Sequence, residues 1–422
     1  MPGRTNLKEL SLLVAVALLV SAFTLHLYGV WSITDLASRG NDVQAVGGAP
    51  QPNSVVAQAP TATSRSGLTT VQSSPTAVPT ASPGQATTTP QAAQQLSPTQ
   101  EIAGPPTVDF HEGMSILVYK QDYANTEELR LKADAMFTRL KGLGVNTVAI
   151  VFPVLIDTAT SNVVYADAKL TPTEDDLATL IDRAHRRGLA VSLRPLIDER
   201  RLGSDWRATI RPASPSAWFE SYGRLLVGYA RLAELEKVLM FSIGSEMSSM
   251  ERYADHWQAL AADVRRVYSG KLIYSTNWDT KPNDVAFWDS LDYIGVDVFF
   301  PLGAPENATV NDLVAAWKTW IPTLDAFKKA AGKPIIITEI GTTAQHRSFM
   351  APYRPNHNTV TSQEDQRMFY EAACAALPGV IDGGLYWWQS GLYIPNPLTD
   401  RSFNPLGKAA EQEMRRCYTE HF

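Results

Sequence analysis

Cysteine and histidine are scarce in this sequence. Its 422 residues include two cysteines, Cys374 and Cys417, and seven histidines. Two cysteines exclude a small disulfide-rich scaffold. The histidines form neither H-x-H nor H-E-x-x-H, which disfavours a metal-dependent hydrolase, and we expect no metal and no other cofactor. Whether the two cysteines pair stays open, because the distance between them decides it.

Positive charge does not predominate either. Lys and Arg number 37 against 43 Asp and Glu, for a net charge of −6. No basic patch is interleaved with aromatic residues, so we expect no nucleic-acid partner. Ten Trp and fifteen Tyr are present. Such a composition suits both a protein that stacks on sugar rings and a protein with a large aromatic core.

The longest apolar run lies near the amino terminus. Residues 10–33 carry no Asp, Glu, Lys or Arg, and Arg4 and Lys8 precede them while Asp35 follows. This run is long enough to span a bilayer, and the flanking charges place residues 1–9 in the cytoplasm. We therefore expect a transmembrane signal anchor at 10–33, a single pass through the cell membrane and an extracellular remainder. The alternative is a cleaved signal peptide and a secreted protein.

Residues 34–107 are rich in Pro, Thr, Ala, Ser and Gln. Between Asp42 and Glu101 the only charged residue is Arg65. Such a segment cannot bury enough apolar area to offset chain entropy, which predicts a disordered linker.

From residue 108 to 422, short apolar runs alternate with amphipathic stretches. Strands are expected at 114–119, 145–152, 189–195, 238–243, 272–277, 293–300, 334–341 and 384–388. Helical stretches include 310–330 and one that ends at 268, for which Ser248 and Glu251 form an S-x-x-E capping box. Eight strands alternating with eight helical segments predict an α/β fold, a (β/α)8 TIM barrel preceded by the transmembrane anchor and the disordered linker. No G-x-G-x-x-G follows the first strand, which argues against a dinucleotide-binding fold.

Two glutamates end buried strands of this barrel. Glu246 follows the fourth apolar run and Gly244, and Glu339 ends the seventh run. The carboxyl ends of barrel strands meet at one mouth, so we expect the two carboxylates to face each other. Glycosidic bond cleavage needs such a pair, and a separation of about 5–5.5 Å leads to retention of configuration. Alternatively, Glu246 caps a helix and Glu339 forms an ordinary salt bridge.

Other polar and aromatic residues are predicted at the same mouth. The candidates for substrate binding are Arg194, Asn277, Trp278, Asp297, Trp387 and Trp388. Aromatic rings bind the apolar faces of sugars, and Asn and Asp bind hydroxyl groups. Strand alternation lets only one of Trp387 and Trp388 point inward, and we favour Trp388. Arg194 contacts a hydroxyl or carboxylate, or else neutralises Asp198 or Glu199.

Six motifs occur in order along the barrel: GMSILVY, IGSEM, STNW, GVDVFFPL, ITEIG and YWW. In this order and spacing the chain resembles glycoside hydrolase family 113, over about residues 110–418. The resemblance implies a clan A barrel and mainly β-1,4-mannanase activity. It also implies that Glu246 is the acid/base, Glu339 the nucleophile and Trp388 the platform for the cleaved sugar. Two departures from the clan are Ser245, where Asn is common, and Phe299, where a Tyr often holds the nucleophile.

The sequence thus predicts a membrane-tethered, retaining β-glycoside hydrolase that acts by double displacement. The first substrate is mannan or glucomannan, a β-1,4-linked polysaccharide or its oligosaccharides. The alternatives are a hydrolase of another β-linked glycan (a glucan or a cell-envelope polysaccharide) and a non-catalytic glycan-binding barrel.

Overall fold

The computed structural model describes residues 106, 108–354 and 359–422. The anchor expected at 10–33 and the linker expected at 34–107 lie outside the described residues, apart from Pro106. Among the residues that are described, no helix is long and apolar enough to cross a bilayer. The anchor and the linker therefore stay predictions.

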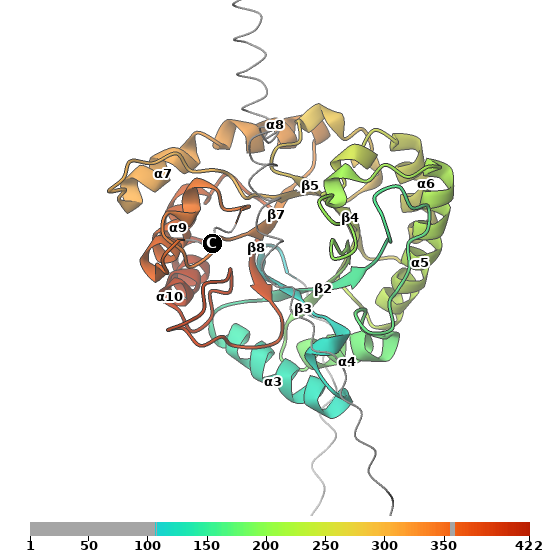
Figure 1. Cartoon of the computed structure of the whole chain (residues 1–422), viewed down its shortest axis with the longest axis horizontal. Helices are drawn as coiled ribbons and strands as arrows, with labels where there is room; N and C mark the ends of the chain where they lie inside the picture. Colours follow the sequence, from blue (N-terminus) through green and yellow to red (C-terminus); the bar gives the residue numbers. More distant parts are fainter. Residues whose placement is uncertain (1–105, 107, 355–358) are drawn as a thin grey trace, which may run out of the picture. The chain divides into compact units, whose positions relative to one another are not determined.

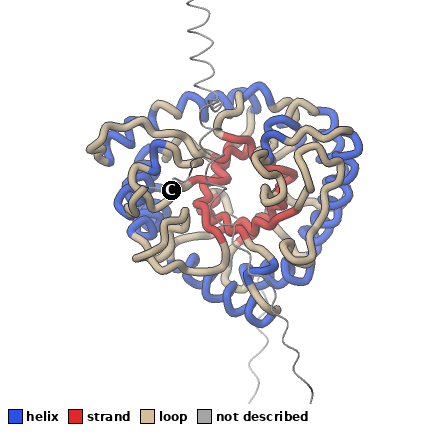
Figure 2. The backbone as a smooth tube through the Cα atoms, in the orientation of Figure 1, coloured by secondary structure: helices blue, strands red, loops and turns tan. Residues whose placement is uncertain are grey.

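Eight parallel strands close into a barrel in the order of the sequence, and β8 pairs with β1 (Figures 1 and 2). This confirms the predicted barrel. The strands are β1 (His111–Leu117), β2 (Thr147–Val154), β3 (Ala190–Ile197), β4 (Met240–Ser245), β5 (Lys271–Asn277), β6 (Tyr293–Asp297), β7 (Ile335–Ile340) and β8 (Gly384–Ser390).

The helices form the outer layer around these strands (Figure 2). They are α3 (Thr126–Gly142), α4 (Glu174–His185), α5 (Pro215–Leu235), α6 (Ala254–Arg265), α7 (Val310–Lys318), α8 (Ile321–Ala331), α9 (Gln363–Ala376) and α10 (Ala409–Arg416). The short 3-10 turns are η1 (Lys120–Asp122), η2 (Arg207–Thr209), η3 (Ser248–Met250), η4 (Pro282–Asp284), η5 (Trp288–Ser290) and η6 (Ser348–Met350), and a π-helical turn, η7 (Cys417–His421), follows α10.

The strands are apolar on both faces because the barrel has two cores. All eight residues of β2 and all eight of β3 are buried, as expected for parallel strands covered by helices on one side and by the barrel interior on the other. The larger core fills the space between sheet and helices. The smaller core, inside the barrel, contains Val151, Leu196, Met240, Ile273 and Tyr386 among others.

Two connections differ from the predicted pattern. The helix expected at 310–330 is two helices, α7 and α8, and α8 carries Pro322 in its first turn, where proline is tolerated. Residues 278–292, all of them described, join β5 to β6 through η4 and η5 without an α-helix. The barrel therefore does not have one α-helix for every strand.

The capping box predicted at Ser248 and Glu251 is wrong. Ser248 lies in η3, and α6 begins only at Ala254 with no side-chain cap. The Glu251 carboxylate instead accepts hydrogen bonds from Tyr274 and Thr276 of β5, and its side chain is buried. Glu251 thus accepts from hydroxyl groups of the neighbouring strand and not from the N–H of Ser248, which a capping box requires.

Cys374 of α9 and Cys417 of η7 form a disulfide, with their Cα atoms 5.3 Å apart. This settles the question that the sequence left open. The bond joins α9 to the turn that follows α10.

The first and last parts of the barrel domain are also joined to each other. The Phe110 and Phe422 rings stack with their centroids 4.9 Å apart. The Tyr418 hydroxyl lies 2.6 Å from the carbonyl oxygen of Gly113 and 2.9 Å from that of Leu385. Tyr418 thus packs where β8 meets β1.

Candidate active site

Glu246 and Glu339 both lie at carboxyl ends of barrel strands, as predicted. Glu246 directly follows β4, and Glu339 is the next-to-last residue of β7. Each is 6 % exposed. Glu246 has a backbone φ of +52°, a region that residues other than glycine rarely adopt. Its N–H donates to the carbonyl of Ser275 on β5, at 2.8 Å.

One guanidinium connects the carboxylates of β6 and β7. Nη2 of Arg194 lies 2.7 Å from Oδ2 of Asp297 and 2.9 Å from Oε1 of Glu339. Asp297 and Glu339 are register neighbours, and Thr338 donates to the other oxygen of Asp297 at 2.7 Å. The alternative partners of Arg194, Asp198 and Glu199, pair with Arg200 and Arg207 instead.

Burial raises the pKa values of Asp297 and Glu339, the two carboxyl groups that contact Arg194. Burial, and next the negative charge of Asp297, raise the pKa of Glu339 well above its usual range, and Arg194 opposes the shift. Burial likewise raises the pKa of Asp297 to about 6 against the effect of Arg194. A single arginine thus serves two buried carboxylates, so the pair retains a proton to a higher pH than isolated carboxyl groups.

A second arginine, which the sequence analysis missed, contacts Glu246. Nη1 of Arg207 lies 2.6 Å from Oε2 of Glu246, and its Nη2 lies 3.2 Å from Oε1 of Glu199. Nε of Arg207 also donates to the carbonyl of Ile197 at 2.9 Å. The only sequence signal was its place in the loop after the third strand, on the side of the barrel where functional loops gather.

A small cavity of about 80 Å³ lies beside these groups. It is lined by Leu117, Tyr119, Pro153, Leu196, Asp198, Arg207, Glu339 and Trp388. The Tyr119 hydroxyl donates to Asp198 at 2.7 Å, and the guanidinium of Arg200 lies 3.8 Å from the centre of the Tyr119 ring. The cavity thus combines one predicted carboxylate with aromatic and polar groups able to bind a sugar.

The two tryptophans of β8 point to opposite sides of the sheet. Trp388 lines the cavity and packs on the interior core. Trp387 is fully buried in the outer layer, where its ring stacks on Tyr370 of α9 with centroids 3.9 Å apart. The prediction that Trp387 contacts substrate is therefore wrong, because strand alternation turns its side chain away from the cavity.

Asn277, the last residue of β5, and Trp278, which directly follows it, do not line the cavity. Asn277 is a register neighbour of Asp297 and its Oδ1 accepts the N–H of Trp278 at 2.9 Å. The Trp278 ring stacks on Tyr353 at 5.2 Å between centroids. Their role in binding stays a prediction.

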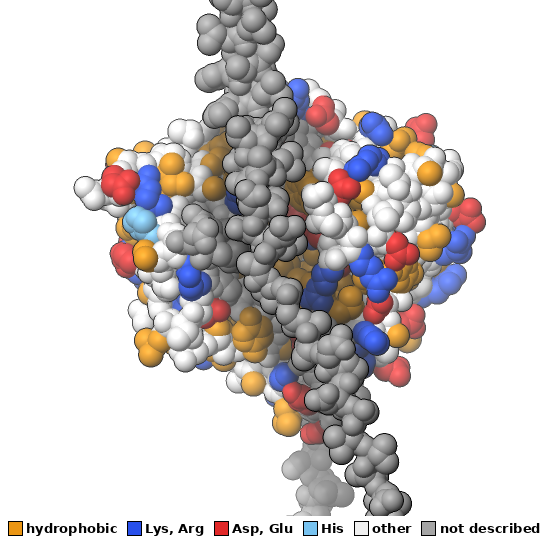
Figure 3. All heavy atoms as spheres, in the orientation of Figure 1, with side chains coloured by type: hydrophobic (Ala, Val, Ile, Leu, Met, Phe, Trp, Pro, Cys, Tyr) orange, Lys and Arg blue, Asp and Glu red, His pale blue; other side chains and the backbone are white. Residues whose placement is uncertain are grey.

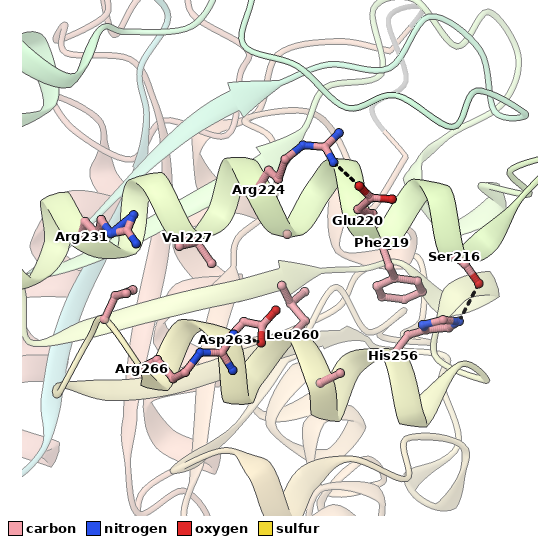
Figure 4. Close-up of a pocket in the computed structure, with 13 residues that line it drawn as sticks. Ser216, Phe219, Glu220, Arg224, Val227, Arg231, His256, Leu260, Asp263 and Arg266 are labelled. Atoms are coloured by element: carbon pink, nitrogen blue, oxygen red, sulfur yellow. Dashed lines mark hydrogen bonds and ion pairs between the residues drawn. The ribbon is translucent and has the colours of Figure 1, made fainter.

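A larger cavity, of about 740 Å³, lies outside the barrel. It runs between α5 and α6, and Figure 4 shows Phe219 beside His256 and the Glu220–Arg224 ion pair along it. None of the predicted site residues lines this groove.

Acidic and basic side chains are mixed on the face drawn in Figure 3. Within 108–354 and 359–422, no three or more His, Cys, Asp or Glu side chains are grouped to hold a metal ion.

A closed (β/α)8 barrel with buried glutamates at the ends of β4 and β7 has the architecture of a glycoside hydrolase of the double-carboxylate type. The profile of Glycoside Hydrolase Family 113 matches residues 119–408. The chain belongs to glycoside hydrolase family 113, and it is a glycoside hydrolase. This confirms the family that the six motifs resemble.

Solved structures of the same family are similar to this chain. The family 113 β-mannanase AaManA from Alicyclobacillus acidocaldarius, in complex with ManMIm, is 25% identical and has a TM-score of 0.66; the match covers 75% of this chain and 99% of that one. A complex structure of a family 113 β-1,4-mannanase is 25% identical with a TM-score of 0.65, covering 74% and 100% of the two chains. No curated protein matches the sequence.

Proposed function

We propose that the protein is a retaining β-glycoside hydrolase that cleaves β-1,4-linked mannan or glucomannan. The observation that carries this proposal is the pair of buried carboxylates at the ends of β4 and β7, Glu246 and Glu339, each in contact with an arginine. The substrate is supported by the names of two solved family members, which are β-mannanases.

In the first step, a carboxylate oxygen of Glu339 attacks the anomeric carbon while Glu246 gives its proton to the departing glycosidic oxygen. The carbon–oxygen bond to the leaving sugar breaks and an ester to Glu339 forms. In the second step, Glu246 takes a proton from water, the water oxygen bonds to the anomeric carbon and Glu339 is released. Two inversions restore the original configuration.

Arg194 supports the role of Glu339 as nucleophile. An attacking carboxylate must be ionised, and burial opposes ionisation. The guanidinium at 2.9 Å favours the ionised form. It also replaces the tyrosine donor common in the clan, since the residue near that position is Phe299, whose ring packs against Phe403.

Arg207 supports the orientation of Glu246. A guanidinium only donates hydrogen bonds, so its contact with Oε2 leaves Oε1 to carry the transferable proton. Trp388, at the same cavity, offers an apolar face to the sugar, and Tyr119 with Asp198 offers hydroxyl contacts. These groups form the proposed binding site for the cleaved sugar.

The test combines a substrate screen with two variants of the full chain. Manno-, gluco- and xylo-oligosaccharides are digested and the anomeric form of the first product is followed by NMR. We expect cleavage of mannosides with retention, and loss of several orders of magnitude in Glu339→Ala with partial rescue by azide to an inverted product. Rescue with inversion in Glu246→Ala would reverse the two roles. Binding without turnover would favour a glycan-binding barrel, and preference for another sugar would change the substrate.

We also propose that the barrel works outside the cell, held to the membrane by residues 10–33. The apolar run of this segment supports anchoring, and the Cys374–Cys417 disulfide is typical of exported proteins. Protease treatment of intact cells should remove the barrel domain and leave a membrane-bound remnant. Protein in the culture medium with residues 1–33 missing would instead indicate a cleaved signal peptide.

A further inference from the structure

A chain of hydrogen bonds leads from a buried glutamate to the segment that carries Glu246. Glu251 is 2 % exposed. Its Oε1 accepts from the hydroxyl of Tyr274 at 3.0 Å and from that of Thr276 at 2.7 Å. The Tyr274 oxygen in turn accepts the N–H of Met247 at 3.2 Å, which is the peptide group directly after Glu246.

The direction of these bonds follows from the chemistry of the groups. Oε1 of Glu251 accepts two hydroxyl hydrogen bonds, while a phenol can donate one hydrogen bond and accept others. Glu251 therefore turns the Tyr274 proton toward itself and leaves an oxygen lone pair for Met247. Without this arrangement the Met247 N–H would lose its partner in a buried place, where an unpaired amide is unfavourable.

The backbone of Glu246 needs such support. Its φ of +52° is sparsely populated for a residue with a side chain, and such conformations persist only where the surroundings hold them. The strand β5 holds both sides of this residue. The Ser275 carbonyl accepts the N–H of Glu246, and the Tyr274 hydroxyl accepts the next N–H along the chain.

Packing leaves the segment little room to rearrange. A Cβ added at Gly244 would lie 2.6 Å from Cε of Met247, 2.9 Å from the Trp257 ring and 3.0 Å from the Tyr274 ring. The strand end that precedes Glu246 is thus enclosed by the same side chains.

We propose that Tyr274 and Glu251 are positioning residues for the carboxyl group of Glu246. They set the backbone angle from which its side chain reaches the glycosidic oxygen. This inference rests on the proposed role of Glu246 as acid/base. Neither residue lines the cavity beside Glu339, so both act through the main chain and not on the substrate.

The test uses the dependence of the rate on the leaving group. An acid/base residue matters for a sugar or methylumbelliferyl leaving group, which must be protonated, and hardly matters for dinitrophenol, which leaves as an anion. On aryl β-mannosides or mannobiosides, Tyr274→Phe in the full chain should lower kcat/KM for the methylumbelliferyl substrate by roughly 10–100-fold. It should change kcat/KM for the dinitrophenyl substrate by less than about threefold. Glu251→Gln, which keeps the shape of the side chain, should produce the same pattern to a smaller extent.

A matched control is Tyr268→Phe. The Tyr268 hydroxyl is also buried and donates to a main-chain carbonyl, that of Val238, at 2.9 Å. Val238 precedes the amino end of β4, so this hydrogen bond lies at the opposite end of the strand from Glu246. We expect its kcat/KM to be unchanged for both substrates, with a loss of thermal stability similar to that of Tyr274→Phe.

The outcomes separate this inference from the proposed function. Suppose that Glu246→Ala shows the expected dependence on the leaving group. Then an equal loss of kcat/KM on both substrates in Tyr274→Phe and Glu251→Gln would overturn the positioning role. An unchanged kcat/KM on both substrates would overturn it as well. If Glu246→Ala itself lowers both rates equally, the proposed role of Glu246 is wrong. Should Tyr274→Phe fail to fold, the pattern in Glu251→Gln decides.

Discussion

Nη1 of Arg207 lies 2.6 Å from Oε2 of Glu246, so a fixed positive charge contacts the carboxylate that follows β4. Both side chains are largely buried, and a hydrogen bond donated by a charged guanidinium is stronger under such conditions than in water.

Arg207→Met should therefore lower activity. Loss of a charged hydrogen bond leaves Glu246 without its orienting partner, and at about 1.5–3 kcal/mol this corresponds to a roughly 10–100-fold lower kcat/KM. Arg201→Met is the control, because Arg201 is 45 % exposed and pairs with Asp157 and Asp167. Steady-state rates on the preferred mannoside distinguish the two. Equal activity of both variants would show that Arg207 does not orient the acid/base.

The pH dependence should respond to Asp297. Its negative charge is the second cause, after burial, of the raised pKa of Glu339. In Asp297→Asn that charge is gone, so the pKa of Glu339 falls and the nucleophile ionises at lower pH. The acid limb of the kcat/KM profile should then move to lower pH than in the wild type. An acid limb that stays in place, or moves to higher pH, would contradict the assignment.

Stability should depend on pH through Glu251. Burial raises its pKa from 4.5 to about 7, so the folded protein holds this proton more tightly than the unfolded chain does. The stabilisation is complete below pH 4.5 and is lost as the pH rises to about 7. Glu251→Gln removes this dependence. Between these limits the unfolding free energy of wild type relative to the variant should fall by roughly 3 kcal/mol, measured by urea titration. A constant difference would argue against a buried, titrating carboxyl.

The disulfide should stabilise the domain with little effect on chemistry. The cysteines are 43 residues apart, and closing a loop of that size is worth about 2–4 kcal/mol. The double variant Cys374→Ser/Cys417→Ser should unfold at lower urea concentration and keep its kcat at 25 °C. A large loss of kcat without unfolding would mean that the outer layer influences the site.

The barrel and its two carboxylates were predictable because both depend on local patterns and one topological rule. Fully buried parallel strands appear as continuous apolar runs, and the carboxyl ends of such strands share one mouth. Glu246 and Glu339 follow from these two facts. The strand boundaries moved by a few residues, as at β1, which begins at His111 and not at 114.

The arginine contacts were not predictable in the same way. Arg207 lies in a loop, and the destination of a loop side chain depends on segments distant in sequence. The capping box predicted at Ser248 is wrong for a related reason. Its glutamate, Glu251, accepts hydrogen bonds from the hydroxyl groups of Tyr274 and Thr276. Sequence patterns specify local partners, whereas these side chains are held by partners on another strand.

The contacts that join β1 to β8 and Tyr418 have a consequence for synthesis. While the chain emerges from the ribosome, the early strands can pair in order, yet β1 lacks its second neighbour until residues 384–390 have been made. Until then the nascent sheet has two open edges, which invite pairing with other chains. Tyr418 and Phe422, which are made after β8, contact the region where β1 and β8 meet. Loss of residues 411–422 should therefore produce aggregation during expression.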